Sequence, residues 1–218
     1  MHVALGIAEV NLVGLLGGLD ATWSRDGQPL LPVGTIYDPF VARALEPWSF
    51  GIYAGGQSIL VGMPSGVTLG PEGGAHQSVV MPSIGIEQPG CVAWEPAFGR
   101  DYERTFLHAL SRLGRPDRSS AYFRLSTRPL DPGLSRTPAR ADVLAGGYRL
   151  RPRDGARVTI AAMGAVVPEA VAAAEESTPT SSASPAPTCY SAPSRRARRS
   201  ARASPRSSTG CSARHGRS

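Results

Sequence analysis

Short apolar runs alternate with helix-like segments over the first 130 residues. Five runs have strand character, at residues 2–7, 30–36, 58–62, 91–94 and 121–126. Helices are predicted over three ranges, 9–19, 40–48 and 102–113. The second of these follows Asp38-Pro39, which offers an N-cap residue and a first-turn proline. Alternation of strands and helices predicts an α/β fold, with a mostly parallel sheet and helices on both faces.

The remaining segments differ in composition. Residues 64–89 are rich in glycine and proline without periodicity, and we predict a long loop with a functional role. Residues 131–142 are predicted to be a linker, and residues 143–176 begin a second α/β unit that is too small to bury both faces of a sheet. Residues 177–218 are mainly Ser, Pro, Arg, Ala and Thr. We expect this tail to be disordered, because it has too little apolar surface to offset its chain entropy.

The basic character of the chain is confined to the tail. Residues 1–176 contain 15 arginines and 17 acidic residues, a formal charge of −2, whereas residues 177–218 contain eight arginines and no acidic residue. Every basic residue is arginine, and a GC-rich coding sequence accounts for such an excess of Arg, Ala, Gly and Pro. The basic isoelectric point therefore does not predict a nucleic-acid-binding surface.

Cysteine spacing and apolar run length limit the class of protein further. Cys91, Cys189 and Cys211 lack CxxC spacing and histidines at ligand spacing, so neither a metal site nor a disulfide framework is predicted. The first apolar stretch has no positive n-region and is interrupted by Glu9 and Asn11, unlike a signal peptide. No apolar run reaches membrane-spanning length. These features favour a cytoplasmic protein without a membrane partner.

Three motifs resemble the pyrimidine-binding domain of transketolase-like thiamine-diphosphate enzymes. They are GIAE at 6–9, LLPVGTIYDPF at 30–40 and EGGAHQS at 72–78. The resemblance implies a pyrimidine-binding domain over residues 1–130 and the beginning of that family's C-terminal domain over residues 143–176. Within the family, the longer runs SGVTLGPEGGAHQS and PGCVAWEPAF are similar to the homodimeric type of pyruvate dehydrogenase decarboxylating component.

The resemblance implies site residues. Glu9 matches a glutamate that hydrogen-bonds a ring nitrogen of the cofactor's aminopyrimidine and so activates the cofactor. That role needs a protonated carboxyl near neutral pH, which partial burial beside Ile7 and Val10 would favour. Tyr37 and Phe40 match aromatic positions that line the pyrimidine ring.

His76 matches a histidine on the substrate side of the cofactor, where an imidazole can donate or accept a proton. Glu72 and Gln77 are candidate neighbours. Sequence position alone leaves ordinary roles open for these residues. Glu9 could be a solvated glutamate in the first turn of a helix, Tyr37 and Phe40 could be core residues, and His76 could be a solvated loop histidine.

Part of the family pattern is missing. Such enzymes bind the diphosphate and Mg²⁺ through a separate domain with a GDG motif, which is absent here; RDG at 25–27 and 153–155 lacks the first glycine. We expect the chain to bind only the pyrimidine half of thiamine diphosphate, while the diphosphate-binding domain of a partner chain or subunit supplies Mg²⁺. Strands expected ahead of GIAE are also missing, so we expect that the chain has lost its beginning.

The tail suggests a frameshift. Residues 178–192 match a one-nucleotide shift of a GC-rich coding sequence for the next strand of the family's C-terminal domain. We therefore hypothesise a frameshift close to Ser177, which would make the tail an out-of-frame translation.

The motifs predict a fragment of a thiamine-diphosphate-dependent 2-oxo-acid dehydrogenase component that is inactive alone. Intact relatives, homodimers resembling pyruvate dehydrogenase (acetyl-transferring), decarboxylate pyruvate and pass the acetyl group to a lipoyl acyltransferase. The alternative is a transketolase, which transfers two-carbon ketol units between sugar phosphates. An alternative of another class is nucleic-acid binding through residues 194–206, which we rank last because no aromatic residues are interleaved there for base stacking.

Overall fold

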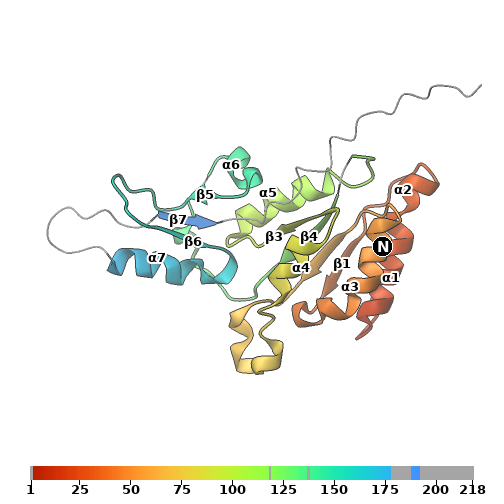
Figure 1. Ribbon diagram of the computed structural model, residues 1–218, viewed down its shortest axis with the longest axis horizontal. Coiled ribbons are helices and arrows are strands. Elements are labelled where there is room, and N and C mark those ends of the chain that lie inside the picture. The colour runs from red at the N-terminus through yellow and green to blue at the C-terminus, as the bar shows by residue number, and fades with distance from the viewer. Residues whose placement is uncertain (1, 118, 137, 178–187, 192–218) are drawn as a thin grey trace, which may run out of the picture.

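The computed structural model describes residues 2–117, 119–136, 138–177 and 188–191, and its larger part is built on a four-stranded parallel sheet (Figure 1). The strands are β1 (Val33–Ile36), β2 (Ile59–Gly62), β3 (Cys91–Trp94) and β4 (Ser120–Arg124). Their order is β1-β2-β4-β3, and all three strand pairs are parallel. The predicted parallel α/β fold is confirmed.

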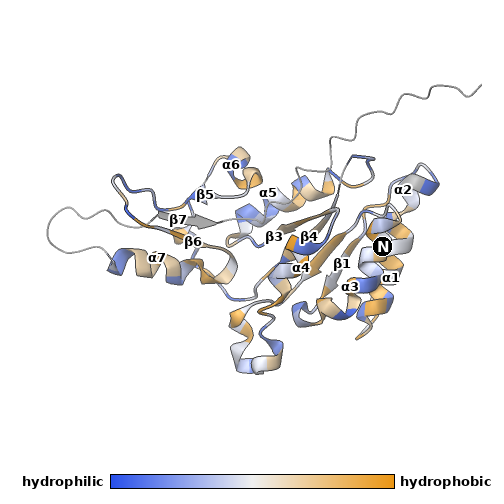
Figure 2. Cartoon of the chain, viewed as in Figure 1, coloured by the Kyte–Doolittle hydropathy of each residue, from blue (hydrophilic) through white to orange (hydrophobic). Residues whose placement is uncertain are grey.

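Helices cover both faces of this sheet. The α-helices are α1 (Glu9–Asp20), α2 (Thr22–Arg25), α3 (Leu45–Tyr53), α4 (Met81–Glu87) and α5 (Gly99–Leu110). Three 3₁₀ segments are η1 (Asp38–Ala44), η2 (Val67–Glu72) and η3 (Gly74–His76). Because successive strand residues face opposite sides, Leu60 and Tyr122 pack with α1, α3 and α4, whereas Phe123 packs with α5. Figure 2 shows the amphipathic α5 with blue and orange residues along one helix.

The second unit contains a smaller sheet. Its elements are η4 (Pro132–Leu134), α6 (Arg140–Ala145), β5 (Tyr148–Arg149), β6 (Thr159–Ala162), η5 (Gly164–Val166), α7 (Val167–Glu176) and β7 (Thr188–Ser191). The strand order is β5-β7-β6, with β6 parallel and β5 antiparallel to β7. Val167 and Val171 of α7 pack with Phe98, which precedes α5. The two units are thus joined through a shared apolar cluster.

The expectation of disorder from residue 177 onward does not hold for Thr188–Ser191. This segment forms β7, which satisfies strand hydrogen bonds of both β5 and β6, and its threonine and tyrosine suit a strand. The hypothesised frameshift segment is described only in part, and the Arg-rich residues 194–206 lie outside the described residues.

Three other local predictions are wrong. Residues 2–7 do not form a strand: all six are exposed, Ile7 by 91%, and Gly6 has a positive φ of 67° that interrupts an extended backbone. The long loop contains α4, which starts with Pro82 in its first turn. The helix predicted at 40–48 is divided into η1 and α3. None of the described helices combines the length and the apolar composition needed to span a bilayer.

A buried carboxylate lies at the edge of the sheet where the strands begin. Asp20, the last residue of α1, is 1% exposed and packs against Gly56, just before β2. Neither of its carboxylate oxygens has a hydrogen-bond partner among the described residues. Burial raises the pKa of Asp20 to about 6, and the nearby Ser58 side chain opposes only part of that rise.

Asp20→Asn is expected to stabilise the protein at alkaline pH. A carboxyl whose pKa is raised in the folded state contributes stability below its unfolded value of 3.8 and loses it as the pH rises through about 6. The variant should therefore gain roughly 1–2 kcal/mol in the free energy of unfolding at pH 8 and almost nothing at pH 4. Urea unfolding at both pH values measures the difference. Asp26→Asn, at an exposed aspartate, is the control; an equal gain at both pH values for Asp20→Asn would contradict the account.

Candidate active site

The carboxyl ends of the four parallel strands bring polar side chains to one edge of the sheet. Asp38 follows β1, Glu95 follows β3, and Arg124 is the last residue of β4. A loop after β2 spans residues 63–80 and carries His76. In open α/β sheets this edge is the usual place for a ligand site.

A buried charge cluster, the Arg124 cluster, ties this edge together; it consists of Asp38, Glu95, Tyr122 and Arg124. Arg124 is 5% exposed and donates from Nε to Asp38 Oδ2 at 3.2 Å and from Nη1 to Glu95 Oε2. Tyr122 donates its hydroxyl hydrogen to the other oxygen of Asp38, which is fully buried. Every charge in this cluster is therefore met by an opposite charge or a donor, as burial requires.

The pKa values follow from this packing. Burial raises the pKa of Glu95, and Arg124 opposes that rise. Burial alone would lower the pKa of Arg124, but the charges of Glu95 and Asp38 outweigh it and the pKa is raised. Burial and Asp38 together raise the pKa of Tyr122, so its hydroxyl remains a donor. The Tyr122 hydroxyl is therefore protonated at neutral pH and donates to Asp38.

Next to the Arg124 cluster, three rings form the aromatic cluster Tyr37, Phe40 and His76. The ring centroids are 5.2 Å apart for Tyr37 and Phe40, 5.9 Å for Tyr37 and His76, and 6.1 Å for Phe40 and His76. The Arg43 guanidinium lies 4.2 Å from the Phe40 ring centroid. Residues 37 and 76, far apart in sequence, thus contribute to one partly buried aromatic surface.

Glu72 links two members of the aromatic cluster. Tyr37 donates its hydroxyl hydrogen to Glu72 Oε2 at 2.5 Å, and this bond raises the pKa of Tyr37 to about 12. His76 Nδ1 lies 3.1 Å from the Glu72 carbonyl oxygen. Glu72, considered from sequence only as a neighbour, therefore helps to orient Tyr37. Gln77, the residue after His76, is partly buried.

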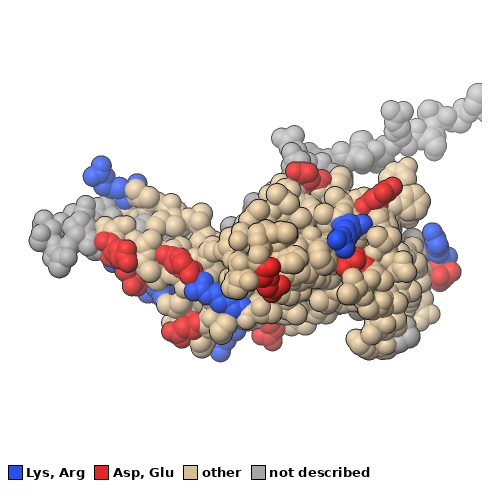
Figure 3. Space-filling view, turned by 90° about the horizontal axis from the view of Figure 1, so that it is seen from below, with Lys and Arg blue, Asp and Glu red and all other residues tan. Residues whose placement is uncertain are grey.

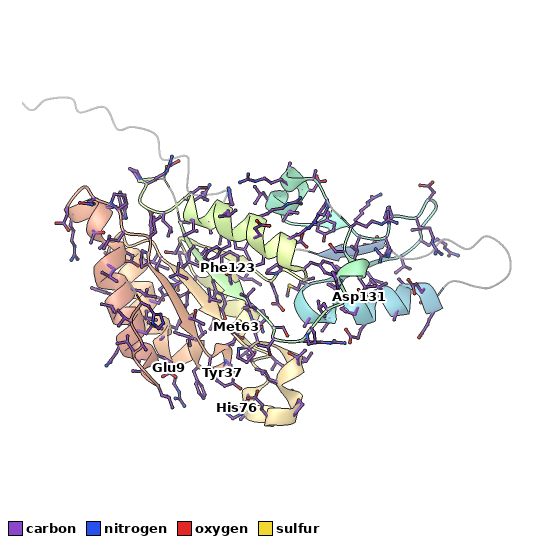
Figure 4. All side chains as sticks on the ribbon, turned by 180° about the vertical axis from the view of Figure 1, so that it is seen from behind. Glu9, Tyr37, Met63, His76, Phe123 and Asp131 are labelled. Carbon is purple, nitrogen blue, oxygen red and sulfur yellow. The ribbon has the colours of Figure 1, made fainter. Side chains whose placement is uncertain are left out.

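Glu9 is the first residue of α1 and is partly buried. Asp20, at the other end of α1, lies beside the start of β2, and a helix of this length spans about 18 Å, so Glu9 lies toward the edge where the strands end. Figure 4 shows Glu9, Tyr37 and His76 at the same edge of the domain. The apolar shielding expected from Ile7 and Val10 is not found, because these side chains are 91% and 50% exposed. Shielding of Glu9 would have to come from another chain or segment.

A groove of about 480 Å³ opens beside the loop after β2. It is lined by Val67, Thr68, Thr127 and Arg128. Arg128 also contacts the second unit, where it forms an ion pair with Glu169 at 2.6 Å. Figure 3 shows acidic and basic residues interspersed over the lower face, without a gathering of one sign there. Among the described residues, no group of three or more His, Cys, Asp or Glu side chains has the arrangement of a metal site.

Sequence reasoning found the aromatic cluster but missed the Arg124 cluster. The sequence context of Asp38 predicts an N-cap residue, yet its carboxylate accepts hydrogen bonds from Tyr122 and Arg124 of the distant strand β4. The available signal was the charged Arg124 within the otherwise apolar strand at 121–126, since a charge in a buried strand needs a partner.

No family model matches the chain. It is 30% identical, over 176 residues, to the 6-deoxy-6-sulfo-D-fructose transketolase subunit SqwH of Clostridium sp. (strain MSTE9). The match covers 80% of this chain and 50% of that protein, so the chain spans about half the length of the curated relative it matches.

Solved structures of transketolases have the same fold. The chain superposes on transketolase from Leishmania mexicana with a TM-score of 0.73 and 21% identity, over 86% of this chain and 26% of that one. For transketolase from Campylobacter jejuni subsp. jejuni NCTC 11168 the TM-score is 0.73 with 20% identity, over 88% and 28%. A split-gene transketolase, described as an inactive β4 tetramer, gives 0.60 with 21% identity, over 85% and 55%.

The chain therefore has a transketolase-like fold, and its homologues are enzymes. The resemblance to transketolase-like thiamine-diphosphate enzymes is supported, but these matches do not confirm pyruvate dehydrogenase as the nearest type. They favour the transketolase alternative.

Gly62→Ala tests the packing of the Arg124 cluster. A Cβ at Gly62 would lie 2.0 Å from Asp38 Oδ1, so the carboxylate would have to move away from Tyr122 and Arg124. We expect a loss of about 1–3 kcal/mol in the free energy of unfolding, measured by urea denaturation. Gly18→Ala, within α1 and with open space for a Cβ, should be neutral or slightly stabilising. A neutral Gly62→Ala would show that the carboxylate does not occupy this position.

Proposed function

We propose that this chain supplies the pyrimidine-binding half of a thiamine-diphosphate-dependent transketolase. The observation that carries the proposal is the aromatic cluster of Tyr37, Phe40 and His76, at the strand-end edge of a transketolase-like domain, with Glu9 at the same edge. A flat heterocycle requires aromatic walls and one properly placed polar group, and these residues offer both.

The residues fit the pyrimidine half of the cofactor. Phe40 and Tyr37 would cover the faces of the pyrimidine ring. Because the Tyr37 hydroxyl already donates to Glu72, the contact between Tyr37 and the pyrimidine would be apolar. Glu9 would donate a carboxyl hydrogen bond to a ring nitrogen. His76 would exchange a proton with a substrate oxygen. Bound thiamine diphosphate would supply the nucleophilic carbon and the electron sink for transfer of a two-carbon unit.

A partner would complete the site. The exposed Ile7 and Val10 flank Glu9, and a diphosphate-binding domain covering them would both shield the carboxyl and bring the Mg²⁺ site. The word "subunit" in the name of the Clostridium relative and the split gene of a solved transketolase support a two-chain arrangement. We propose a partner subunit, rather than a lipoyl acyltransferase, as the first partner.

Glu9→Gln should remove cofactor activation. In a complex with a diphosphate-binding transketolase subunit, we expect kcat to fall by about 10²–10⁴-fold, because Gln cannot transfer the carboxyl proton. Calorimetric titration with thiamine diphosphate and Mg²⁺ should show that affinity changes much less. The matched control is Glu46→Gln, also a first-turn glutamate but exposed on α3. Equal kcat for Glu9→Gln and wild type would refute the assigned role.

The reaction class is tested with two substrates. The same complex should transfer a ketol unit from fructose 6-phosphate to an aldose phosphate and should not decarboxylate pyruvate with ferricyanide as electron acceptor. The SGVTLGPEGGAHQS run keeps pyruvate dehydrogenase as the second candidate. Pyruvate decarboxylation without ketol transfer would reject the transketolase proposal in favour of that candidate and its lipoyl acyltransferase partner.

A further inference from the structure

The loop that carries His76 is closed on itself by Ser78, which also bonds Arg124 of β4. A second attachment joins the Thr68 and Ser126 hydroxyls, 3.1 Å apart, just beyond the end of β4. The Ser78 hydroxyl oxygen accepts a hydrogen bond from the Gly66 amide at 2.8 Å, which joins the two ends of residues 66–78, the His76 loop. The Ser78 carbonyl accepts from Arg124 Nη2 at 3.1 Å. Ser78 is 6% exposed, so these bonds are shielded from water.

The backbone of Ser78 needs this support. Its φ is +48°, in the left-handed region that a residue with a side chain adopts at a cost. Such a conformation persists where surrounding contacts fix it, and here both the hydroxyl and the carbonyl are engaged. The backbone of Ser78 therefore keeps its left-handed conformation, although the residue has a β-carbon, because the bonds to Arg124 and Gly66 hold it there.

Arg124 also bonds the segment that carries the other two rings of the aromatic cluster, Tyr37 and Phe40. Its Nε–H donates to Asp38, the residue between Tyr37 and the Pro39–Phe40 turn. One buried guanidinium at the end of β4 is thus bonded both to the segment carrying Tyr37 and Phe40 and to the segment carrying His76. Its bonds reach the backbone and side chains that flank the three rings, so its influence on the rings is indirect.

We propose that Arg124, acting through Ser78 and Asp38, is a positioning residue that fixes His76 against Tyr37 and Phe40. The catalytic consequence rests on the proposed function, in which His76 meets the substrate. The placement itself does not depend on it, because it concerns distances within this chain. Removing the Arg124–Ser78 link should let the His76 loop move without removing any side chain of the aromatic cluster.

The test is a comparison of NOEs in the full chain. Wild type should show NOEs between ring hydrogens of His76 and Tyr37, whose centroids are 5.9 Å apart. Ser78→Ala removes the hydroxyl that accepts from the Gly66 amide and, at 3.4 Å, from Arg124 Nη2, while the Arg124–Ser78 carbonyl bond and the ion pairs of Arg124 remain. We expect these NOEs to weaken. Amide protection over residues 66–78 should fall by about tenfold, the change expected from loss of one buried hydrogen bond.

Two further variants separate positioning from general stability. Arg124→Gln should lose the same NOEs, because it removes the donor to the Ser78 carbonyl oxygen. It also leaves Asp38 and Glu95 without a cation and so lowers stability. If it does not fold, Arg124→Lys replaces it, since Lys keeps a cation beside the two carboxylates but lacks the guanidinium fork that bonds Ser78 and both carboxylates at once. Tyr148→Phe is the matched control, since Tyr148 donates to the buried Asp101 at 2.8 Å between α5 and the second unit. It should lower stability while keeping the His76 NOEs.

The proposal is overturned if folded Arg124→Gln or Arg124→Lys keeps wild-type NOEs and loop protection, or if Tyr148→Phe loses them to the same extent. A separate titration with thiamine diphosphate and Mg²⁺, of the wild-type chain in complex with a diphosphate-binding transketolase subunit, distinguishes the two proposals. Absence of binding to that complex would count against the proposed function, whereas the NOE result would still decide whether Arg124 positions His76.

Discussion

A buried guanidinium cannot be left without counter-charges, and this constraint organises the strand-end edge of the domain. Arg124 lies between Asp38 and Glu95, and Tyr122 supplies the remaining donor to Asp38. Removing one partner would leave a buried charge uncompensated, which is far more costly than losing a surface ion pair. The ends of β1, β3 and β4 are therefore held in one relative arrangement.

The same constraint fixes local sequence choices and joins the two units. Gly62 has no room for a side chain because Asp38 lies against it. A Cβ at Gly164, at the start of η5, would lie 2.6 Å from Glu95 Oε1, and the Gly164 amide donates to the Glu95 carbonyl oxygen at 3.1 Å. The geometry of the aromatic cluster thus depends on a network that reaches from β1 to the second unit. Its open side, with Ile7 and Val10 exposed, is what a site completed by another domain would present.

Much of the fold could be predicted from sequence because it follows from local patterns. The apolar runs gave β1 to β4 nearly in place, and the amphipathic repeat gave α5. The aromatic positions were identified through motif resemblance, and the structure brings Tyr37, Phe40 and His76 within ring-contact distance. Their assignment to a cofactor stays a prediction.

What could not be predicted depends on contacts between distant segments. Asp38 has the sequence context of a helix cap. Only the position of β4 shows that its carboxylate instead accepts a hydrogen bond from Arg124. β7 lies within a tail whose composition is typical of disorder, yet it pairs with both β5 and β6. Residues 2–7 have strand composition but no strand beside them in the described chain. In each case the availability of a partner outweighed local propensity.

The central claim is that the strand-end edge of this domain binds the pyrimidine ring of thiamine diphosphate. Chemical-shift mapping of the isotope-labelled full chain, in complex with a diphosphate-binding transketolase subunit, during titration with thiamine diphosphate and Mg²⁺ tests it most directly. The account predicts saturable shifts of Tyr37, Phe40, His76 and Glu9, with Asp20 at the opposite edge unaffected. Saturable shifts confined to other parts of the chain, or none at these four residues, would contradict it.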